Sequence, residues 1–138
     1  LEGNLPYSLQ VILMGDSTVD LLRKLKAGER SDDLSRMLCD VLRAMTVLGG
    51  SAWESDLHDT LMMIWSLRQE EDKLATAMFS RALEFLQEKA VLRVEKRAKG
   101  DLSREKATEE RFYQVGDWLT ILRIFGGDKE VVLSRGRY

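Results

Sequence analysis

Residues 72–97 read DKLATAMFSRALEFLQEKAVLRVEKR and change from a helical to a β pattern part-way along. Up to Lys89 the apolar residues recur three or four positions apart, which is the spacing of one face of an α-helix. From Val91 to Arg97 polar and β-branched residues partly alternate, as in a strand with one buried face. We therefore expect a helix over about 72–89 and a strand directly after it.

A second β-leaning run, Arg111–Val115, follows the first after a polar and charged segment that contains Gly100. Two such runs with a long charged connection predict a β-hairpin that projects from the body of the protein.

Four helices are expected before this hairpin, a short one followed by three longer ones, and the one over 72–89 is the last. A short helix over about 18–26 precedes Gly28, and a longer one runs from Asp32 to Leu48, where six apolar residues share one face. Gly49-Gly50 ends the longer helix. The next helix is expected to begin with a capping box formed by Ser51 and Glu54.

The C-terminal residues leave two interpretations open. Asp117 could cap a helix over Trp118–Phe125, ended by Gly126-Gly127. The same residues, rich in Ile, Thr, Phe and Trp, could instead form a strand paired with Glu130–Ser134. We favour the helix.

Composition excludes several classes of protein. The 138 residues fit one domain with or without an appended arm, and 44% apolar with 32% charged residues is a globular balance. One Cys and one His exclude an internal disulfide and a Cys/His zinc site, so no metal or cofactor is expected. Without a phosphate-binding loop, a nucleophile elbow or an H-E-x-x-H motif, no enzyme activity is expected either. No apolar run is long enough to span a membrane, so we expect a cytoplasmic protein.

The formal charge of −2 is unevenly distributed along the chain. Residues 1–67 carry 6 basic and 10 acidic side chains, whereas residues 89–111 carry 8 basic and 5 acidic ones. The positive surplus therefore falls on the predicted hairpin.

The junction Leu86-Gln-Glu-Lys-Ala-Val-Leu-Arg-Val resembles the "L-x-E-K-G-L-[IV]-x-[RK]" junction of winged helix-turn-helix regulators of the MarR, PadR and ArsR kind. Arg111-Phe-Tyr-Gln-Val is similar to their returning strand, "R-x-Y-x-[LV]". Ala90 stands where these regulators carry Gly. The resemblance covers about residues 32–116 and implies a mainly α fold with a small β-hairpin wing, an α+β class, flanked by N- and C-terminal segments. We divide the chain into an N-terminal arm (1–30), a winged helix-turn-helix domain (31–116) and a C-terminal extension (117–138).

The resemblance implies sequence-specific binding of double-stranded DNA by a transcription regulator, with the third helix in the major groove and the wing on phosphates. The implied contacts on the helix are Lys73, Thr76, Ala77, Ser80 and Arg81, and Arg81 is the best candidate to bind a guanine. The implied contacts on the wing are Arg93, Lys96, Arg97, Lys99, Arg104, Lys106 and Arg111.

The acids Glu70, Glu71 and Asp72 at the start of the third helix support a different function. Acids stabilise a helix N-terminus but repel phosphates. The alternative is a winged-helix adaptor that binds proteins and makes no direct contact with DNA.

Apolar residues near both termini exceed what the three-helix core requires, and they predict a homodimer. The expected interface residues are Leu9, Ile12, Leu13, Trp118, Leu122 and Phe125. The sequence does not indicate an effector ligand.

Overall fold

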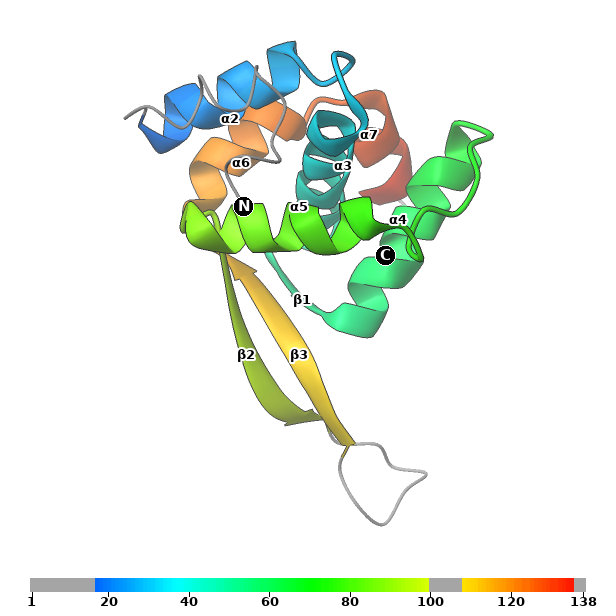
Figure 1. The fold of residues 1–138 in the computed structure, drawn as a ribbon, viewed down its shortest axis with the longest axis vertical. Coiled ribbons are helices and arrows are strands. Elements are labelled where there is room, and N and C mark those ends of the chain that lie inside the picture. The colour runs from blue at the N-terminus through cyan, green and yellow to red at the C-terminus, as the bar shows by residue number, and fades with distance from the viewer. Residues whose placement is uncertain (1–16, 100–107, 136–138) are drawn as a thin grey trace.

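The computed structural model describes residues 17–99 and 108–135. Its helices pack around one central helix, and a three-stranded antiparallel sheet extends away from them (Figure 1). The predicted α+β class is confirmed. In chain order the elements are α2 (Thr18–Ala27), α3 (Asp33–Val47), β1 (Ser51–Trp53), α4 (Glu54–Leu67), α5 (Ala77–Glu88), β2 (Leu92–Lys99), β3 (Thr108–Val115), α6 (Trp118–Phe125) and α7 (Lys129–Arg135).

Helix α3 is the centre of the fold. Thirteen of its fifteen residues are buried, because α2, α4, α5, α6 and α7 all pack against it. The predicted apolar face is present, with Leu38, Leu42 and Met45 fully buried. The opposite side of the helix is buried as well, and it carries the charged residues Asp40 and Arg43.

Both ends of α3 form as the sequence predicts. The Asp32 carboxylate accepts a hydrogen bond from the Ser35 amide at 2.8 Å and caps the N-terminus. Gly49 and Gly50 follow the helix with φ angles of 79° and 92°, in the left-handed region. A Cβ on Gly50 would lie 2.8 Å from Cε3 of Trp118, so the close approach of α6 also requires glycine there.

The capping box predicted at Ser51 is wrong. Ser51 to Trp53 form strand β1, and α4 begins at Glu54 without a side-chain cap. The reason is long-range pairing: Ser51 lies opposite Gln114, and Trp53 lies opposite Phe112 in β3. The Trp53 and Phe112 rings also meet edge to face at 5.1 Å.

The third helix is shorter than predicted. α5 begins at Ala77 rather than near residue 72, because the acidic segment before it forms a turn in which Asp72 accepts from the Leu74 amide at 2.8 Å. At its other end Ala90 has a φ of 57°, and the Val91 amide donates to the Leu86 carbonyl at 2.9 Å. Ala90 thus adopts a left-handed turn at the position where the regulators that this junction resembles carry glycine.

The predicted hairpin is confirmed and is longer than expected. β2 pairs antiparallel with β3 along both strands, from Leu92 opposite Val115 to Lys99 opposite Thr108. β1 pairs with the other edge of β3, so the strand order is β1-β3-β2. The two long strands extend away from the helices (Figure 1).

The C-terminal residues are helical, as favoured. α6 spans Trp118–Phe125, and the Asp117 carboxylate caps it by accepting from the Thr120 amide at 3.2 Å. Residues Glu130–Ser134 belong to α7, so the alternative strand pair is wrong. Buried residues of α2 and α6, including Leu22 and Ile121, share one hydrophobic cluster with the central helices. Among the helices of residues 17–99 and 108–135, none combines the length and apolar character needed to cross a bilayer.

Candidate nucleic-acid interface

The hairpin presents four of the predicted phosphate contacts to solvent. The side chains of Arg93, Lys96, Arg97 and Arg111 are all exposed. In the register of the two strands Lys96 lies directly opposite Arg111. Partners in an antiparallel pair project on the same face, so these two cations form a pair on one side of the ribbon. The β2 strand ends at Lys99, while Arg104 and Lys106 lie outside the described residues.

A groove separates this face of the hairpin from helix α5. The hollow has a volume of about 320 Å³, and both elements contribute to its walls. The helix supplies Glu84 and Gln87, and the strands supply Val94, Glu95, Lys96, Arg111 and Tyr113. Lys96 and Arg111 therefore face a surface of α5 that carries one carboxylate, Glu84.

The opposite face of the hairpin holds Arg97 in place. Its guanidinium lies 4.2 Å from the centre of the Phe112 ring, and it forms an ion pair with Glu95. A cation over an aromatic ring is stabilised by the ring quadrupole. Arg97 is thus partly engaged within the hairpin, and Lys96 with Arg111 is the stronger candidate pair for phosphate.

The predicted contacts around α5 lie in different environments. Thr76, Ala77 and Ser80 are exposed, as a helix that reads base edges requires. Thr76 is the N-cap residue rather than part of the helix. Arg81 is half-buried, with Nη1 3.9 Å from the Met78 sulfur.

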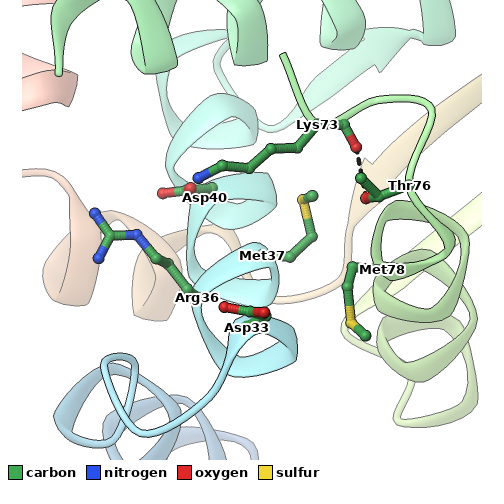
Figure 2. Close-up of a pocket in the computed structure, with 7 residues that line it drawn as sticks. All are labelled: Asp33, Arg36, Met37, Asp40, Lys73, Thr76 and Met78. Atoms are coloured by element: carbon green, nitrogen blue, oxygen red, sulfur yellow. Dashed lines mark hydrogen bonds between the residues drawn. The ribbon is translucent and has the colours of Figure 1, made fainter. Parts of the chain in front are cut away.

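Lys73 is turned inward. Its ammonium pairs with Glu70 at 3.1 Å and lies 5.7 Å from the centre of the Trp65 ring. Figure 2 shows the Lys73 side chain extending from the loop toward α3, over a cavity of about 220 Å³ that Met37 and Met78 also line. This placement does not support the prediction that Lys73 lies on the outward face of the third helix.

Acidic side chains surround the base of the hairpin. Arg111 lies 3.9 Å from Glu54, and Glu110 accepts a hydrogen bond from the Ser55 amide at 2.8 Å. The Tyr113 hydroxyl donates to Glu54 at 3.4 Å, and burial together with the Glu54 charge raises the pKa of Tyr113 above its usual value. The two strands therefore carry acids among their cations, and Lys96 and Arg111 line a hollow together with Glu54, Glu109 and Glu110.

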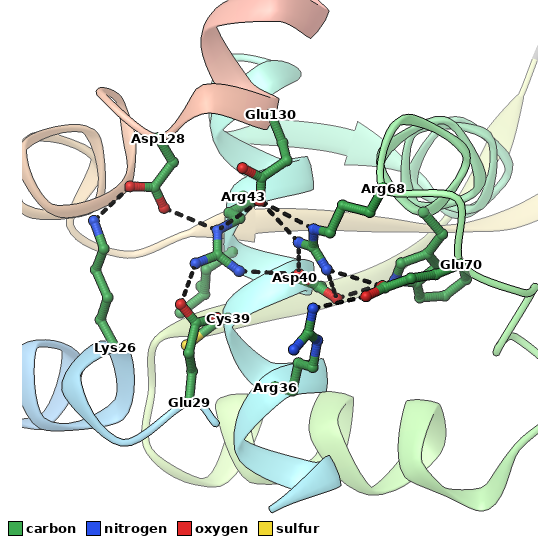
Figure 3. A network of polar contacts seen from close by, with 12 residues as sticks. Lys26, Glu29, Arg36, Cys39, Asp40, Arg43, Arg68, Glu70, Asp128 and Glu130 are labelled. Carbon is green, nitrogen blue, oxygen red and sulfur yellow. Dashed lines mark hydrogen bonds and ion pairs between the residues drawn. The ribbon is translucent and has the colours of Figure 1, made fainter. Parts of the chain in front are cut away.

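A buried ion-pair network lies on the other side of α3 (Figure 3). Asp40, which is 1% exposed, accepts hydrogen bonds from Arg43, Arg68 and the Trp65 indole. Burial alone raises the pKa of this carboxyl group, but the hydrogen bonds and charge of Arg68 outweigh that effect, so the pKa lies below its usual value. The network also contains Lys26, Glu29, Arg36, Glu70, Asp128 and Glu130.

Arg43 connects the α2–α3 loop to the α6–α7 loop. Its guanidinium donates to Glu29 at 2.6 Å, to Asp40 at 3.0 Å and to Asp128 at 2.8 Å. These carboxylates come from the α2–α3 loop, from α3 and from the α6–α7 loop. The network was not predicted from the sequence, because its one local signal is the spacing of Asp40 and Arg43, three residues apart in one helix.

The predicted dimer residues are divided between core and surface. Phe125 is 0% exposed within its own chain, so its side chain does not reach a partner surface, whereas Trp118 and Leu122 are half-buried. Leu9, Ile12 and Leu13 lie outside the described residues. Leu119, Val132 and Leu133 are the most exposed apolar residues of α6 and α7.

The single cysteine, Cys39, is unreactive at neutral pH. Burial raises the pKa of the Cys39 thiol to about 12, and the thiol donates to the Leu25 carbonyl at 3.5 Å. At neutral pH it is therefore a protonated core residue, since only the thiolate is a good nucleophile. Among residues 17–99 and 108–135, no three or more His, Cys, Asp or Glu side chains are grouped as a metal site requires.

No family model matches the chain, and neither the curated proteins nor the solved structures include a match to it.

Proposed function

We propose that this protein is a winged helix-turn-helix protein that binds double-stranded DNA as a transcription regulator. The observation that carries the proposal is the exposed pair Lys96 and Arg111 on a hairpin that follows helices α3, α4 and α5 in the chain. The pairing of β1 with the returning strand supports the same fold, because it ties the base of the hairpin to the segment between α3 and α4. A cytoplasmic location is part of this proposal.

The two parts of the interface contribute differently. The hairpin cations supply phosphate contacts, which give affinity without sequence preference. Ala77 and Ser80 on α5, with Thr76 at its N-cap, are small side chains that let the helix approach base edges closely. Specificity from α5 then rests mainly on Arg81, whose guanidinium must leave Met78 to reach a guanine.

A duplex-binding titration at two salt concentrations tests the proposal. Four phosphate contacts predict that affinity falls roughly 100-fold between 50 and 200 mM salt. Substituting Lys96→Gln with Arg111→Gln is expected to lower affinity at least about 10-fold at 50 mM and to reduce the slope of log K against log salt by about 2. The matched control is Arg23→Gln with Arg123→Gln, which removes two exposed cations on α2 and α6. Absence of duplex binding at low salt, or an equal loss in the control, would contradict DNA binding through the hairpin.

The runner-up function is a protein-binding adaptor of the same fold. The observation that favours it is the charge of α5, where Arg81 is outnumbered by Glu84 and Glu88, while Lys73 before the helix is turned inward. Pull-downs from source lysate before and after nuclease treatment separate the two functions. Partners that remain after nuclease treatment favour the adaptor, and partners that disappear favour DNA.

We also propose that the protein is a homodimer, associated through its terminal segments. Half-buried Trp118 and Leu122, with exposed Leu119, leave apolar surface on α6. Light scattering at micromolar concentration is expected to give about twice the chain mass of 15.8 kDa. Leu122→Glu is expected to halve the mass while the helical circular dichroism signal is retained. A wild-type mass near 15.8 kDa would contradict the dimer.

A further inference from the structure

A hollow rich in cations lies beside the buried network and shares several of its residues. Its volume is about 290 Å³, and it lies where the α2–α3 loop, α3, the end of α4 and the α6–α7 loop meet. Six cations and three carboxylates line it, and two further carboxylates, Asp40 and Glu70, form ion pairs with cations of the lining. The cations are Lys26, Arg30, Arg36, Arg43, Arg68 and Lys129.

Three of these cations are already satisfied by the protein. Arg43 and Arg68 donate to the network carboxylates, Asp40 among them. The Lys26 ammonium donates to Asp128 and to the Ile124 carbonyl, both at 2.5 Å. The three carboxylates of the lining, among them Asp128, are all paired with these cations. These three acids therefore balance the charges of Lys26, Arg43 and Arg68.

The other three cations keep donors available. Arg36 donates through Nη2 to Glu70 at 2.7 Å, but its Nε is buried without a hydrogen-bond partner in the part of the chain that the structure describes. A buried donor without an acceptor is unfavourable, and native proteins rarely leave one. Arg30 and Lys129 are exposed at the rim of the hollow. The unused donors thus come from three separate elements around one space.

We propose that this hollow binds a small anion that carries a phosphate group, held by Arg36, Arg30 and Lys129. A phosphate group offers several acceptor oxygens to the guanidinium groups of Arg30 and Arg36, which bind phosphate with directed hydrogen bonds, and it offers negative charge to the Lys129 ammonium. The volume is roughly ten times the share of one water molecule in the liquid. It suits inorganic phosphate or a short phosphomonoester.

The proposal is tested by calorimetric titration of the full chain with inorganic phosphate and, separately, with glycerol phosphate, at constant ionic strength set by chloride. Arg30→Gln with Lys129→Gln removes two cations of the hollow without changing the buried network. This variant is expected to bind phosphate at least about 10-fold more weakly, because two charge-assisted hydrogen bonds are lost. Tighter binding of glycerol phosphate than of inorganic phosphate would identify a phosphomonoester as the ligand, and equal or weaker binding would identify free phosphate.

Two control variants separate this site from the proposed DNA interface. Arg123→Gln on α6 and the hairpin variant Lys96→Gln with Arg111→Gln are both expected to bind phosphate like the wild type. No saturable binding beyond chloride, unchanged binding by Arg30→Gln with Lys129→Gln, or loss of binding in the hairpin variant would each overturn the proposal. None of these measurements contains DNA, so failure of the phosphate site leaves the DNA-binding proposal intact.

Discussion

Replacing Asp40 by alanine is expected to lower the free energy of unfolding by about 3–5 kcal/mol, since it leaves buried charges without their partner. Asp40 accepts from Arg43 at 3.0 Å, from Arg68 and from the Trp65 indole at 3.0 Å, and it is 1% exposed. Urea unfolding followed by circular dichroism measures the loss. The matched control, Asp59→Ala, removes an exposed carboxylate on α4 and is expected to change stability by at most about 0.5 kcal/mol.

The same carboxylate makes stability depend on pH. Its pKa is lower in the folded protein than in the unfolded chain, so its stabilising contribution is present above the unfolded pKa of about 3.9. That contribution is lost as the pH falls through the folded pKa. Wild-type stability should therefore decrease more steeply below about pH 4 than that of Asp40→Asn. Parallel pH profiles, or an Asp40→Ala variant as stable as Asp59→Ala, would contradict the role given to Asp40.

Phe125→Ala is expected to cost about 3–5 kcal/mol of stability, because it empties a fully enclosed site. The Phe125 ring is 0% exposed, and the Lys26 ammonium and Arg43 guanidinium lie 5.5 and 5.9 Å from its centre. The substitution therefore removes apolar contacts and two cation–π contacts together. Urea unfolding at one fixed protein concentration measures the effect.

The control for Phe125 is Arg123→Ala in the same helix. The Arg123 side chain is exposed, so its truncation is expected to change stability by at most about 0.5 kcal/mol. Light scattering on both variants distinguishes a core role from an interface role. If Phe125→Ala halved the mass of a wild-type dimer without lowering the stability of the monomer, the placement of Phe125 inside its own chain would be refuted.

Local signals in the sequence predicted most of the helices and the hairpin. The predicted cap Asp117 accepts a hydrogen bond from the amide three residues later. Ser17 and Asp32, at the starts of the helices predicted near residues 18 and 32, do the same. Gly49-Gly50 ended α3 where an achiral residue was expected. These features depend on neighbours within one helical turn, so a single sequence contains the information needed to predict them.

Features that depend on distant partners were not predictable in this way. Ser51 has a capping-box sequence, but its pairing with Gln114 decides its conformation. Asp40 and Arg43 lie outside the apolar stripe of α3 and would be solvated on an isolated amphipathic helix. They are buried because Arg68 and Asp128, 28 and 85 residues away along the chain, meet them. The spacing of residues within α3 does not indicate which distant residues will contact the helix.

The candidate interface was predicted more accurately on the hairpin than around the third helix. Alternation along a strand fixes which side chains share a face, so Lys96 and Arg111 could be placed once their register was known. Lys73 was misplaced because the helix begins five residues later than predicted, and Glu70 with Trp65 draws the side chain inward. The position of a cation near a predicted helix start therefore does not determine which way its side chain points.

Among the strands that the structure describes, β2 lies at an edge of the sheet, with one row of its backbone amides and carbonyls unpaired by β3. Such an edge is a template for strand addition by a neighbouring molecule. Five of the eight residues of β2 are charged, and four of these are cations, so two such edges repel each other on approach. This repulsion is screened over about 8 Å at physiological ionic strength. High salt, or neutral residues in place of these cations, would therefore favour edge-to-edge aggregation. The four cations of β2 thus help to keep the protein soluble, because they oppose pairing between the edges of two molecules.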